Sequence, residues 1–395
     1  MEKKTVALGV TGSIAAYKAA QLCSNLHKKG YDVHVLMTRN ATELVAPLTF
    51  ETLSGNRVSV DTFDRNFEWN VQHVSLAKRA GVFVVAPATA NLIAKMACGL
   101  CDDMLTTTLL AARCEKIVCP AMNTGMYDNP ATQQNLEILR ERGVQIVEPG
   151  SGLLACGDTG KGRLADLEDI EEAVAAALSD KPLQGLRVTV TAGGTREALD
   201  PVRFITNHSS GKMGYALARM ARYMGAEVTL ISANCALRAP YGVRVIPVVS
   251  AAEMCEEVLK SAETADILIK AAAPADYRPA QYAPEKIKKS EGPLLLPLER
   301  TADILSAVCA RKRPGQVICG FSMETENLIE NSTRKLHQKG CDMIVANSLR
   351  TEGAGFGTDT NIATLITRGG AEELPLMQKE DLARQILLKL CGMRP

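Results

Sequence analysis

The sequence predicts an α/β protein built from two doubly wound domains in tandem. Its 395 residues are enough for two domains of ordinary size. A buried strand followed by a glycine turn and a helix occurs twice, once from residue 5 and again from residue 186. Between the two, the polar segment 179–185 contains Pro182 and Gly185 and ends an alanine-rich helix. We therefore expect domains at residues 1–182 and 183–395.

The composition is typical of a globular protein and excludes several kinds of partner. The net charge is +1, which argues against nucleic acid or a membrane surface as a general ligand. No apolar run reaches membrane-spanning length and no signal-peptide cleavage pattern is present, so we expect a cytoplasmic protein. The 12 cysteines are then expected to be reduced. We interpret Cys98 and Cys101 as small buried residues and not as a metal or redox motif.

In the first half, polar loops follow the expected strands. The strands are expected at 5–10, 32–37, 81–86, 116–119 and 144–147. The loops after the first four contain Gly12 and Ser13, Thr38, Thr89 and Asn91, and Asn123, respectively. Because ligands of open parallel sheets bind outside the carboxyl ends of the strands, we expect these loops to converge on one ligand. The turn at Gly12 lacks the full G-x-G-x-x-G spacing, so a single-phosphate site and a plain strand–helix turn both remain open there.

Three segments of this half carry a specific combination of motifs. They read Gly12-Ser-Ile-Ala-Ala-Tyr-Lys18, Pro87-Ala-Thr-Ala-Asn91 and Pro120-Ala-Met-Asn-Thr-Gly-Met126. Together they resemble the flavin-containing cysteine decarboxylases, whose usual Pro-Ala-Ser-Ala-Asn-Thr appears here with threonine in place of serine and leucine as the last residue. The resemblance implies a flavodoxin-like fold that binds FMN. It places FMN contacts at Gly12, Ser13, Thr38, Thr89 and Asn91.

The same resemblance implies four residues of a decarboxylation site. His73 would take the proton of the substrate thiol, since an imidazole titrates near neutrality; without the resemblance, a lone histidine before a helix favours a surface or capping role. Asn123 would hold the substrate carboxylate without adding charge, and Met126 would contact the substrate. Cys156 lies in the glycine-rich segment 152–162, a flap in which it would return a proton to an enethiol. The implied reaction is redox-neutral: FMN takes two electrons from the thiol, CO₂ departs, and the electrons return.

The second half is also expected to alternate strands and helices. Strands are expected at 188–191, 227–231, 243–246, 266–270, 317–320 and 343–346, and helices at 213–224, 251–262, 302–310 and 325–338. The polar segment 207–212 runs directly into the first of these helices. Free backbone amides and the helix dipole point the same way there, which predicts an anion site.

Three further segments extend the resemblance. They read Asn207-His-Ser-Ser-Gly-Lys-Met-Gly214, Ala275-Asp-Tyr-Arg278 and Ala283-Pro-Glu-Lys-Ile-Lys-Lys289. They resemble the phosphopantothenate–cysteine ligases, so the whole chain is similar to the bifunctional decarboxylase/ligase family of coenzyme A biosynthesis. The resemblance implies small-molecule substrates: 4′-phosphopantothenate, cysteine and CTP. The acid is activated as an acyl-cytidylate with release of pyrophosphate, and Mg²⁺ is expected because a triphosphate needs charge neutralisation.

The ligase resemblance also implies site residues. Asn207 and Lys286 would be catalytic, Asn207 and Lys212 would contact the substrate, and Asp276 is the candidate metal contact. The implied CTP contacts are Ala271, Ala272, Asp276, Lys286, Ala302, Asp303, Ile304, Phe321, Lys335 and Lys339. Thr301 and Ala302 replace the family's Asn-Pro, so the choice between CTP and ATP remains open.

Other functions predict different residues. A Rossmann dehydrogenase requires a complete glycine motif and a carboxylate after the second strand, where this chain has Met37, Thr38 and Arg39. A non-catalytic flavin-binding regulator could lack His73, Asn123 or Cys156, and all three are present. A ligase whose first half is only an oligomerisation platform would lack flavin. The family resemblance implies trimeric decarboxylase units and dimeric ligase units, which would combine into a dodecamer.

Overall fold

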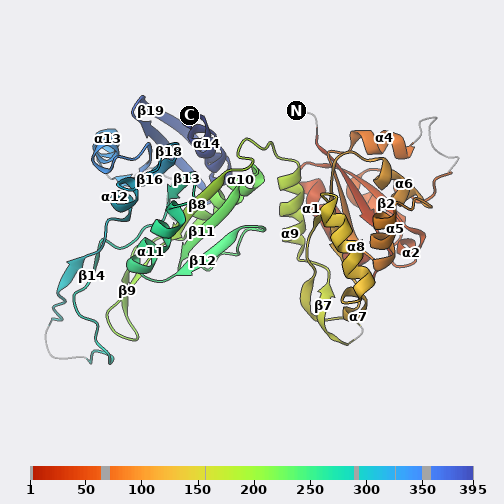
Figure 1. Ribbon diagram of the computed structural model, residues 1–395, viewed down its shortest axis with the longest axis horizontal. Coiled ribbons are helices and arrows are strands. Elements are labelled where there is room, and N and C mark those ends of the chain that lie inside the picture. The colour runs from red at the N-terminus through yellow and green to blue at the C-terminus, as the bar shows by residue number, and fades with distance from the viewer. Residues whose placement is uncertain are drawn as a thin grey trace. The chain divides into compact units, whose positions relative to one another are not determined.

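The computed structural model describes residues 3–63, 72–155, 157–288, 293–324, 326–348 and 357–394. The chain divides into two compact units, Met1–Ser179 and Asp180–Pro395 (Figure 1). Each unit has its own sheet and its own hydrophobic core, so each is described by itself.

Within the described part of the first unit, five parallel strands form one sheet in the order β2-β1-β3-β4-β5. The strands are β1 (Thr5–Val10), β2 (Asp32–Met37), β3 (Val82–Ala88), β4 (Glu115–Pro120) and β5 (Gln145–Ile146). All residues of β1 and β3 are buried, as expected for central parallel strands covered on both faces. This order is the flavodoxin-like arrangement, whose switch point lies between β1 and β3.

Helices cover the sheet of the first unit. They are α1 (Ala16–Lys28), α2 (Arg39–Thr42), α3 (Pro47–Ser54), α4 (Gln72–Arg79), α5 (Ala90–Cys98), α6 (Met104–Ala111), α7 (Thr124–Tyr127), α8 (Pro130–Glu141) and α9 (Leu167–Ala177). Helices α4, α5, α6 and α8 pack with one another and contribute to one apolar cluster around Phe83 and Leu105. Helix α1 packs against α3 and α9. A small antiparallel hairpin, β6 (Gly150–Leu153) and β7 (Thr159–Arg163), stands apart from the sheet.

The described part of the second unit has an eight-stranded sheet in the order β12-β11-β8-β13-β16-β17-β18-β19. Its strands are β8 (Arg187–Gly193), β11 (Glu227–Ala233), β12 (Arg244–Val248), β13 (Ile267–Lys270), β16 (Val317–Glu324), β17 (Met343–Ser348), β18 (Thr360–Thr367) and β19 (Gly370–Gln378). The pairs from β12 through to β17 are parallel and follow the Rossmann order, with a switch point between β8 and β13. Strands β18 and β19 extend the sheet in antiparallel fashion.

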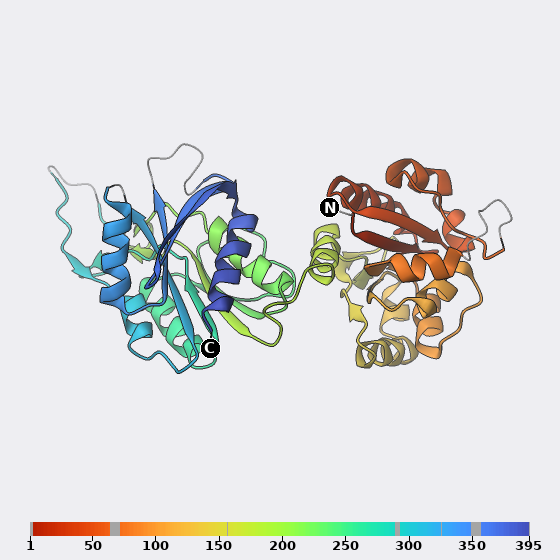
Figure 2. The ribbon, with the colours of Figure 1, turned by 90° about the horizontal axis from the view of Figure 1, so that it is seen from above.

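Helices lie on both faces of this second sheet (Figures 1 and 2). They are α10 (Lys212–Tyr223), α11 (Ala251–Ala262), α12 (Ile304–Cys309), α13 (Leu328–Lys339) and α14 (Lys379–Gly392). Helices α10 and α14 pack together over one apolar cluster, whereas α11, α12 and α13 bury a separate cluster around Leu268 and Ile344. The two clusters explain why most residues of strands β8, β13 and β16 are buried.

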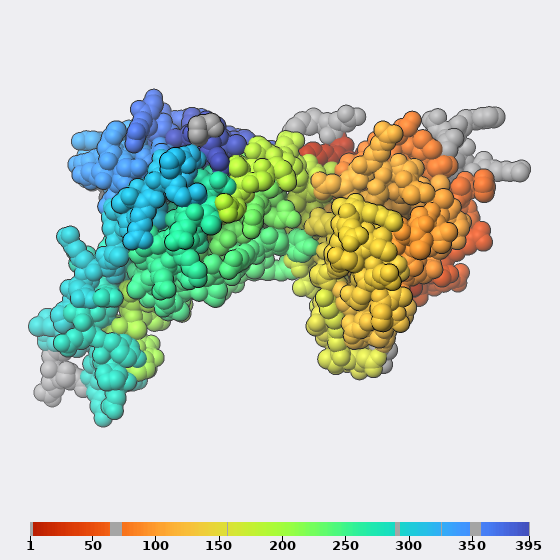
Figure 3. Space-filling model, in the orientation of Figure 1, coloured from red at the N-terminus to blue at the C-terminus, as the bar shows by residue number. Residues whose placement is uncertain are grey.

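Two antiparallel ribbons of the second unit lie outside its sheet. One consists of β9 (Arg196–Ala198) and β10 (Phe204–Thr206), and the other of β14 (Tyr277–Pro279) and β15 (Leu298–Arg300). Strand β14 packs against β9, so the two ribbons support one another. Figure 3 shows the cyan region around β14 projecting from the body of this unit.

The predicted α/β fold with two doubly wound domains is confirmed, and several details were not predicted correctly. The edge strands β18 and β19 and the helix α14 were missed, and segments 196–206 and 150–163 form hairpins where loops were expected. Cys98 and Cys101 are exposed, contrary to our interpretation, because Cys98 is the last residue of α5 and Cys101 lies in the loop that follows this helix. In the described residues, no helix is both long enough and apolar enough to cross a membrane.

Candidate functional sites

The first unit has a cavity of about 1140 Å³ at the carboxyl ends of its strands, at the switch point between β1 and β3. Five residues predicted from the sequence line it: Gly12, Thr38, Thr89, Asn91 and Met126. Ser13 is not among the described residues that line the cavity. Its hydroxyl instead accepts a long hydrogen bond, 3.4 Å, from the amide of Ala15.

Thr11 joins the two loops that meet at this switch point. Its hydroxyl donates to the carbonyl of Pro87 at 2.7 Å and accepts from the amide of Thr89 at 3.0 Å. The neighbouring Gly12 has no room for a side chain, because a Cβ atom there would lie 2.5 Å from the Cβ of Asn40. The bare backbone of Gly12 therefore forms part of the cavity wall, as expected where a ligand approaches the main chain closely.

Thr38 and Thr89 each begin a helix that opens toward this cavity. The hydroxyl of Thr38 accepts from the amide of Ala41 at 3.3 Å, and that of Thr89 accepts from the amide of Leu92 at 3.4 Å. Both are N-cap contacts that satisfy one amide of the first turn. The cavity thus receives two helix N-termini, where backbone amides and the helix dipoles favour an anionic or strongly polar ligand.

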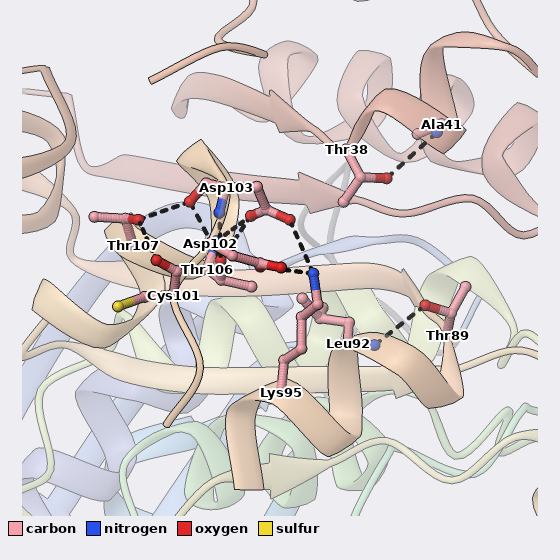
Figure 4. A network of polar contacts seen from close by, with 10 residues as sticks. All are labelled: Thr38, Ala41, Thr89, Leu92, Lys95, Cys101, Asp102, Asp103, Thr106 and Thr107. Carbon is pink, nitrogen blue, oxygen red and sulfur yellow. Dashed lines mark hydrogen bonds and ion pairs between the residues drawn. The ribbon is translucent and has the colours of Figure 1, made fainter. Parts of the chain in front are cut away.

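Lys95 was not predicted from the sequence, yet it lines the same cavity. Its ammonium lies 2.7 Å from the carboxylate of Asp102 and 3.6 Å from that of Asp103 (Figure 4). The hydrogen bond to Asp102 raises the pKa of Lys95, and the same bond lowers the pKa of Asp102. Lys95 lies on α5, and the pair Asp102 and Asp103 follows seven and eight residues later, before α6. This short spacing was the sequence signal that could have identified the ion pair.

Asn123 lies beside the hairpin of β6 and β7. Its side-chain oxygen accepts from the amide of Gly125 at 2.8 Å, and its amide nitrogen donates to the carboxylate of Asp158 at 2.9 Å. The hairpin packs closely here, since a Cβ atom at Gly162 would lie 2.3 Å from the carbonyl oxygen of Met122. Cys156, predicted to be a proton donor, falls outside the described residues.

His73 is partly buried at the start of α4, which packs against α6. Neither His73 nor Asn123 is among the described residues that line the first cavity. One chain therefore does not bring all of the predicted decarboxylation residues into this cavity.

The second unit has a cavity of about 950 Å³, which lies at the switch point between β8 and β13. Almost all residues predicted for the ligase site line it: Asn207, Lys212, Ala271, Ala272, Asp276, Ala302, Asp303, Ile304, Phe321, Lys335 and Lys339. Two threonines, Thr191 of β8 and Thr195 in the loop after β8, bind the backbone that follows β13. The amide of Ala272 donates to the hydroxyl of Thr191 at 3.1 Å, and that of Ala275 donates to Thr195 at 2.9 Å.

One wall of the second cavity is the loop that enters α10. Gly211 has a φ angle of +76°, and a Cβ atom there would lie 2.3 Å from the sulfur of Cys235, so only glycine fits. Residues 211–214, the first turn of α10, line the cavity and provide the predicted helix N-terminus. The amide nitrogen of Asn207 donates to the carbonyls of Ala273 and Pro274, at 3.3 and 3.1 Å. These contacts fix its side chain across the switch point.

The opposite wall carries lysines from α13. Lys335 donates to the carbonyl of Phe321 at 3.1 Å, and Lys339 forms an ion pair with Asp303. Asp303 also caps α12, accepting from the amide of Ser306 at 3.0 Å. Burial raises the pKa of Asp303, but the hydrogen bonds from Lys339 and Ser306 outweigh it and hold that pKa below its ordinary value.

Lys270, the last residue of β13, is a cavity residue that the sequence analysis missed. Burial lowers its pKa from 10.5 to about 8, with Asp303 opposing the shift and the charge of Lys335 adding to it. Among the described residues Lys270 forms no ion pair, because Asp303 is engaged by Lys339. A charged residue that ends an otherwise apolar central strand was the signal that could have identified it.

Lys286 is the one predicted ligase residue that does not line the second cavity among the described residues. It lies on the exposed segment 283–288, between β14 and β15. No cluster of three or more candidate protein ligands for a metal ion occurs in the described parts of the chain. Asp276 therefore offers one carboxylate, which suits an ion that takes its other ligands from phosphates and water.

The chain matches two protein-family models in succession. Residues 1–179 match the Flavoprotein family, and residues 183–393 match the DNA/pantothenate metabolism flavoprotein C-terminal domain. Over 398 residues it is 45% identical to the coenzyme A biosynthesis bifunctional protein CoaBC of Bacillus subtilis (strain 168), covering 100% of this chain and 98% of that protein. It is 44% identical over 386 residues to the protein of the same name from Vibrio cholerae, covering 97% of each.

A solved structure, that of the C-terminal domain of a CoaBC protein, is also similar. It is 43% identical, covers 54% of this chain and 98% of that chain, and has a TM-score of 0.47.

Proposed function

The chain belongs to the family of coenzyme A biosynthesis bifunctional proteins, and from this membership we propose a function for each unit. Residues 183–395 ligate cysteine to 4′-phosphopantothenate, and residues 1–182 decarboxylate the resulting 4′-phosphopantothenoylcysteine to 4′-phosphopantetheine. One observation carries this proposal. Each unit has a cavity at the switch point of its sheet, and those cavities collect most of the residues expected for a flavin and for a nucleotide.

FMN fits the first cavity. The bare backbone at Gly12 and the two helix N-termini capped by Thr38 and Thr89 suit a ligand with a phosphate and a polar chain. When bound, FMN would accept two electrons from the substrate thiol and return them after CO₂ has left. Gly12, Thr38, Thr89 and Asn91 would hold it, and Met126 would contact the substrate beside it.

The protein's own residues bind and protonate the substrate in this unit. His73 takes the thiol proton, and Cys156 returns a proton at the end of the reaction. Asn123 holds the substrate carboxylate through its amide nitrogen. Its amide nitrogen donates one hydrogen to the carboxylate of Asp158 at 2.9 Å, so the substrate would take the second N–H or displace Asp158. A neutral donor binds the carboxylate without stabilising its charge so strongly that CO₂ loss is opposed.

The second cavity binds CTP and the acid to be activated. The carboxylate of 4′-phosphopantothenate attacks the α-phosphorus of CTP, so that pyrophosphate leaves and an acyl-cytidylate forms. The amine of cysteine then attacks the acyl carbon and CMP leaves. Lys212, Lys270, Lys335 and Lys339 of the cavity wall would neutralise the anions, and Asn207 would contact the acyl group. Lys286 would add its charge from the segment 283–288. Asp276 would hold Mg²⁺, which would supply further positive charge for the triphosphate.

We also propose a cytoplasmic homo-oligomer with trimeric decarboxylase units and dimeric ligase units. Several large apolar side chains near the first cavity are solvent-exposed in the single chain, among them Phe63 at 91% and Met126 at 50%. Exposed apolar groups on the rim of a site favour a partner surface. A second chain would also explain why His73 and Asn123 lie outside the cavity of their own chain. Sedimentation of the purified protein tests the assembly.

The decisive test incubates the purified protein with 4′-phosphopantothenate, cysteine, Mg²⁺ and either CTP or ATP. We expect a yellow protein that forms 4′-phosphopantothenoylcysteine and then 4′-phosphopantetheine with CTP, identified by mass spectrometry. A colourless protein that still joins cysteine to 4′-phosphopantothenate would show that the first unit serves only as an oligomerisation platform. Formation of neither product would refute the proposed function.

A further inference from the structure

Asp200 is a buried carboxylate in an otherwise exposed turn. It lies between β9 and β10 and is only 2% exposed, whereas Pro201, Val202 and Arg203 beside it are exposed. Charged side chains are seldom buried unless they are fully hydrogen-bonded. The groups that cover and bind Asp200 therefore indicate what the turn holds in place.

Four donors surround this carboxylate. One oxygen accepts from the amides of Val202 and Arg203, both at 2.8 Å. The other accepts from the guanidinium of Arg203 at 3.0 Å and from the amide of Ile287 at 3.1 Å. Burial raises the pKa of Asp200, but the amides of Val202, Ile287 and Arg203 outweigh it and lower that pKa to about 2. The group is therefore a carboxylate at every pH at which the enzyme would work.

The same contacts reach the segment that carries Lys286. Arg203 donates a second hydrogen bond to the carbonyl of Ile287 at 2.5 Å, so that Asp200 and Arg203 together bind both polar groups of that peptide residue. On the other side of Lys286, the amide of Ala283 donates to the carbonyl of Leu199 at 3.0 Å. The turn thus fixes the backbone on both sides of Lys286.

This turn also connects the segment to the second cavity. Strand β10 leads from the turn to Asn207, which lines the cavity, and β14 begins at Tyr277, which lines it too. The two residues assigned as catalytic, Asn207 and Lys286, are therefore joined through the hairpin of β9 and β10 and not through the sheet.

We propose that Asp200 is a positioning residue of the ligase, which sets the place of Lys286 relative to the cavity by binding the backbone of Ile287. This role rests on the proposed ligase function, because Lys286 is itself assigned through it. Lys286 is exposed and does not line the cavity, so its position depends on how its backbone is held. A carboxylate that fixes the backbone beside it, without touching substrate, is suited to that task.

The test replaces Asp200 by asparagine in the full chain. In Asp200→Asn one carboxylate oxygen becomes an NH₂ group, so the side chain cannot accept both from the turn amides of Val202 and Arg203 and from Ile287 with the Arg203 guanidinium; we therefore expect ligase turnover to fall about tenfold or more. Decarboxylation of supplied 4′-phosphopantothenoylcysteine, measured on the same preparation, should not change. Hydrogen exchange of a peptide covering 283–288 should become faster. Unchanged turnover or unchanged exchange would overturn the role.

A double-variant cycle separates positioning from general stability. If Asp200 acts through Lys286, Asp200→Asn should cause little further loss in a Lys286→Gln background, whereas a full additional loss would overturn the proposal. The matched control is Asp342→Asn, which removes a carboxylate that accepts from the amide of Ile318 at 2.7 Å and pairs with Lys312. We expect that control to lower the unfolding temperature but to keep ligase turnover.

Two further arms keep the outcome clear. Asp200→Glu is the alternative variant if Asp200→Asn fails to fold, because it retains the charge and displaces it by one methylene. We expect the ligase turnover of Asp200→Glu to lie between those of the wild type and Lys286→Gln. Turnover of Asp200→Glu at or above the wild-type value would overturn the proposal. Wild-type protein that forms no 4′-phosphopantothenoylcysteine would refute the ligase function instead, and the hydrogen-exchange comparison would still report whether Asp200 holds the segment.

Discussion

Replacing Lys270 by methionine should stabilise the second unit and weaken its nucleotide binding. Lys270 ends β13 in the wall of the second cavity and forms no ion pair within the described residues. Methionine has a similar length and no charge, so the variant removes the partly buried ammonium and leaves little empty space. The two effects have one cause: the folded protein holds a cation that forms no ion pair among the described residues, although the charges of Asp303 and Asp276 partly favour it.

The magnitude follows from the pKa of Lys270, which burial lowers from 10.5 to about 8. At about 1.36 kcal/mol per pKa unit, the folded state disfavours the ammonium by roughly 3 kcal/mol. The folded-state pKa lies below the unfolded one, so this penalty is complete below pH 8 and disappears as the pH rises toward 10.5. We expect Lys270→Met to raise the free energy of unfolding by up to about 3 kcal/mol at pH 7 but by only about 1 kcal/mol at pH 10.

Scanning calorimetry of the full chain measures this difference. The transition of the second unit is the one that CTP shifts in the wild type, and the variant should raise its midpoint by about 6–12 °C at pH 7. CTP should bind the variant about tenfold or more weakly, since a charge-assisted contact is lost. Lys260→Met is the matched control, because Lys260 is 75% exposed on α11 and its loss should change neither quantity. A variant that is less stable than the wild type at pH 7, or that binds CTP equally well, would refute the reasoning.

Three other substitutions test the remaining contacts. Gly12→Ala should lower the flavin content per chain, measured by absorbance, because its Cβ would lie 2.5 Å from that of Asn40; full flavin content would show that the wall can adjust. His73→Asn should abolish reduction of the flavin by 4′-phosphopantothenoylcysteine in stopped-flow absorbance while ligation continues, and normal reduction would remove His73 from the reaction. Asn207→Asp loses the donor to the carbonyls of Ala273 and Pro274, so the acyl-cytidylate should accumulate and react slowly with cysteine in quenched-flow assays. Coupling to cysteine at the wild-type rate would contradict that role.

The central strands could be predicted from the sequence because they are buried on both faces. Strands β1, β3 and β8 are continuous apolar or β-branched runs, which few other structures produce. The edge strand β19 was missed for the opposite reason, since most of its residues are exposed and it pairs along one side only. The position of β19 depends on its pairing with β18, and that pairing cannot be predicted from the local sequence pattern.

The residues of the candidate sites also fall into two groups, those that were predicted from the sequence and those that were missed. Asp276 and Phe321 were predicted through the ligase resemblance, and the structure places both in the cavity wall, Asp276 after β13 and Phe321 within β16. Lys95 and Lys270 were missed: the sequence pattern can mark their positions, but only the fold shows which carboxylates lie within reach of each ammonium. Lys286 shows the limit of motif matching: the motif identifies the residue, but its segment is held by Asp200 and lies outside the cavity wall.

The two cavities share a topology and differ in how their lysines are compensated. In the first, Lys95 is matched by Asp102 and Asp103, so the cavity wall adds little net positive charge. In the second, Asp303 is engaged by Lys339, which leaves Lys270 and Lys335 without a carboxylate of their own in the described cavity wall. An excess of partly buried cations is costly until an anion arrives, which suits a site that must bind a triphosphate and later release pyrophosphate. A cofactor that stays bound needs no such excess. The electrostatics of the two walls therefore match a resident flavin in the first unit and a consumed nucleotide in the second.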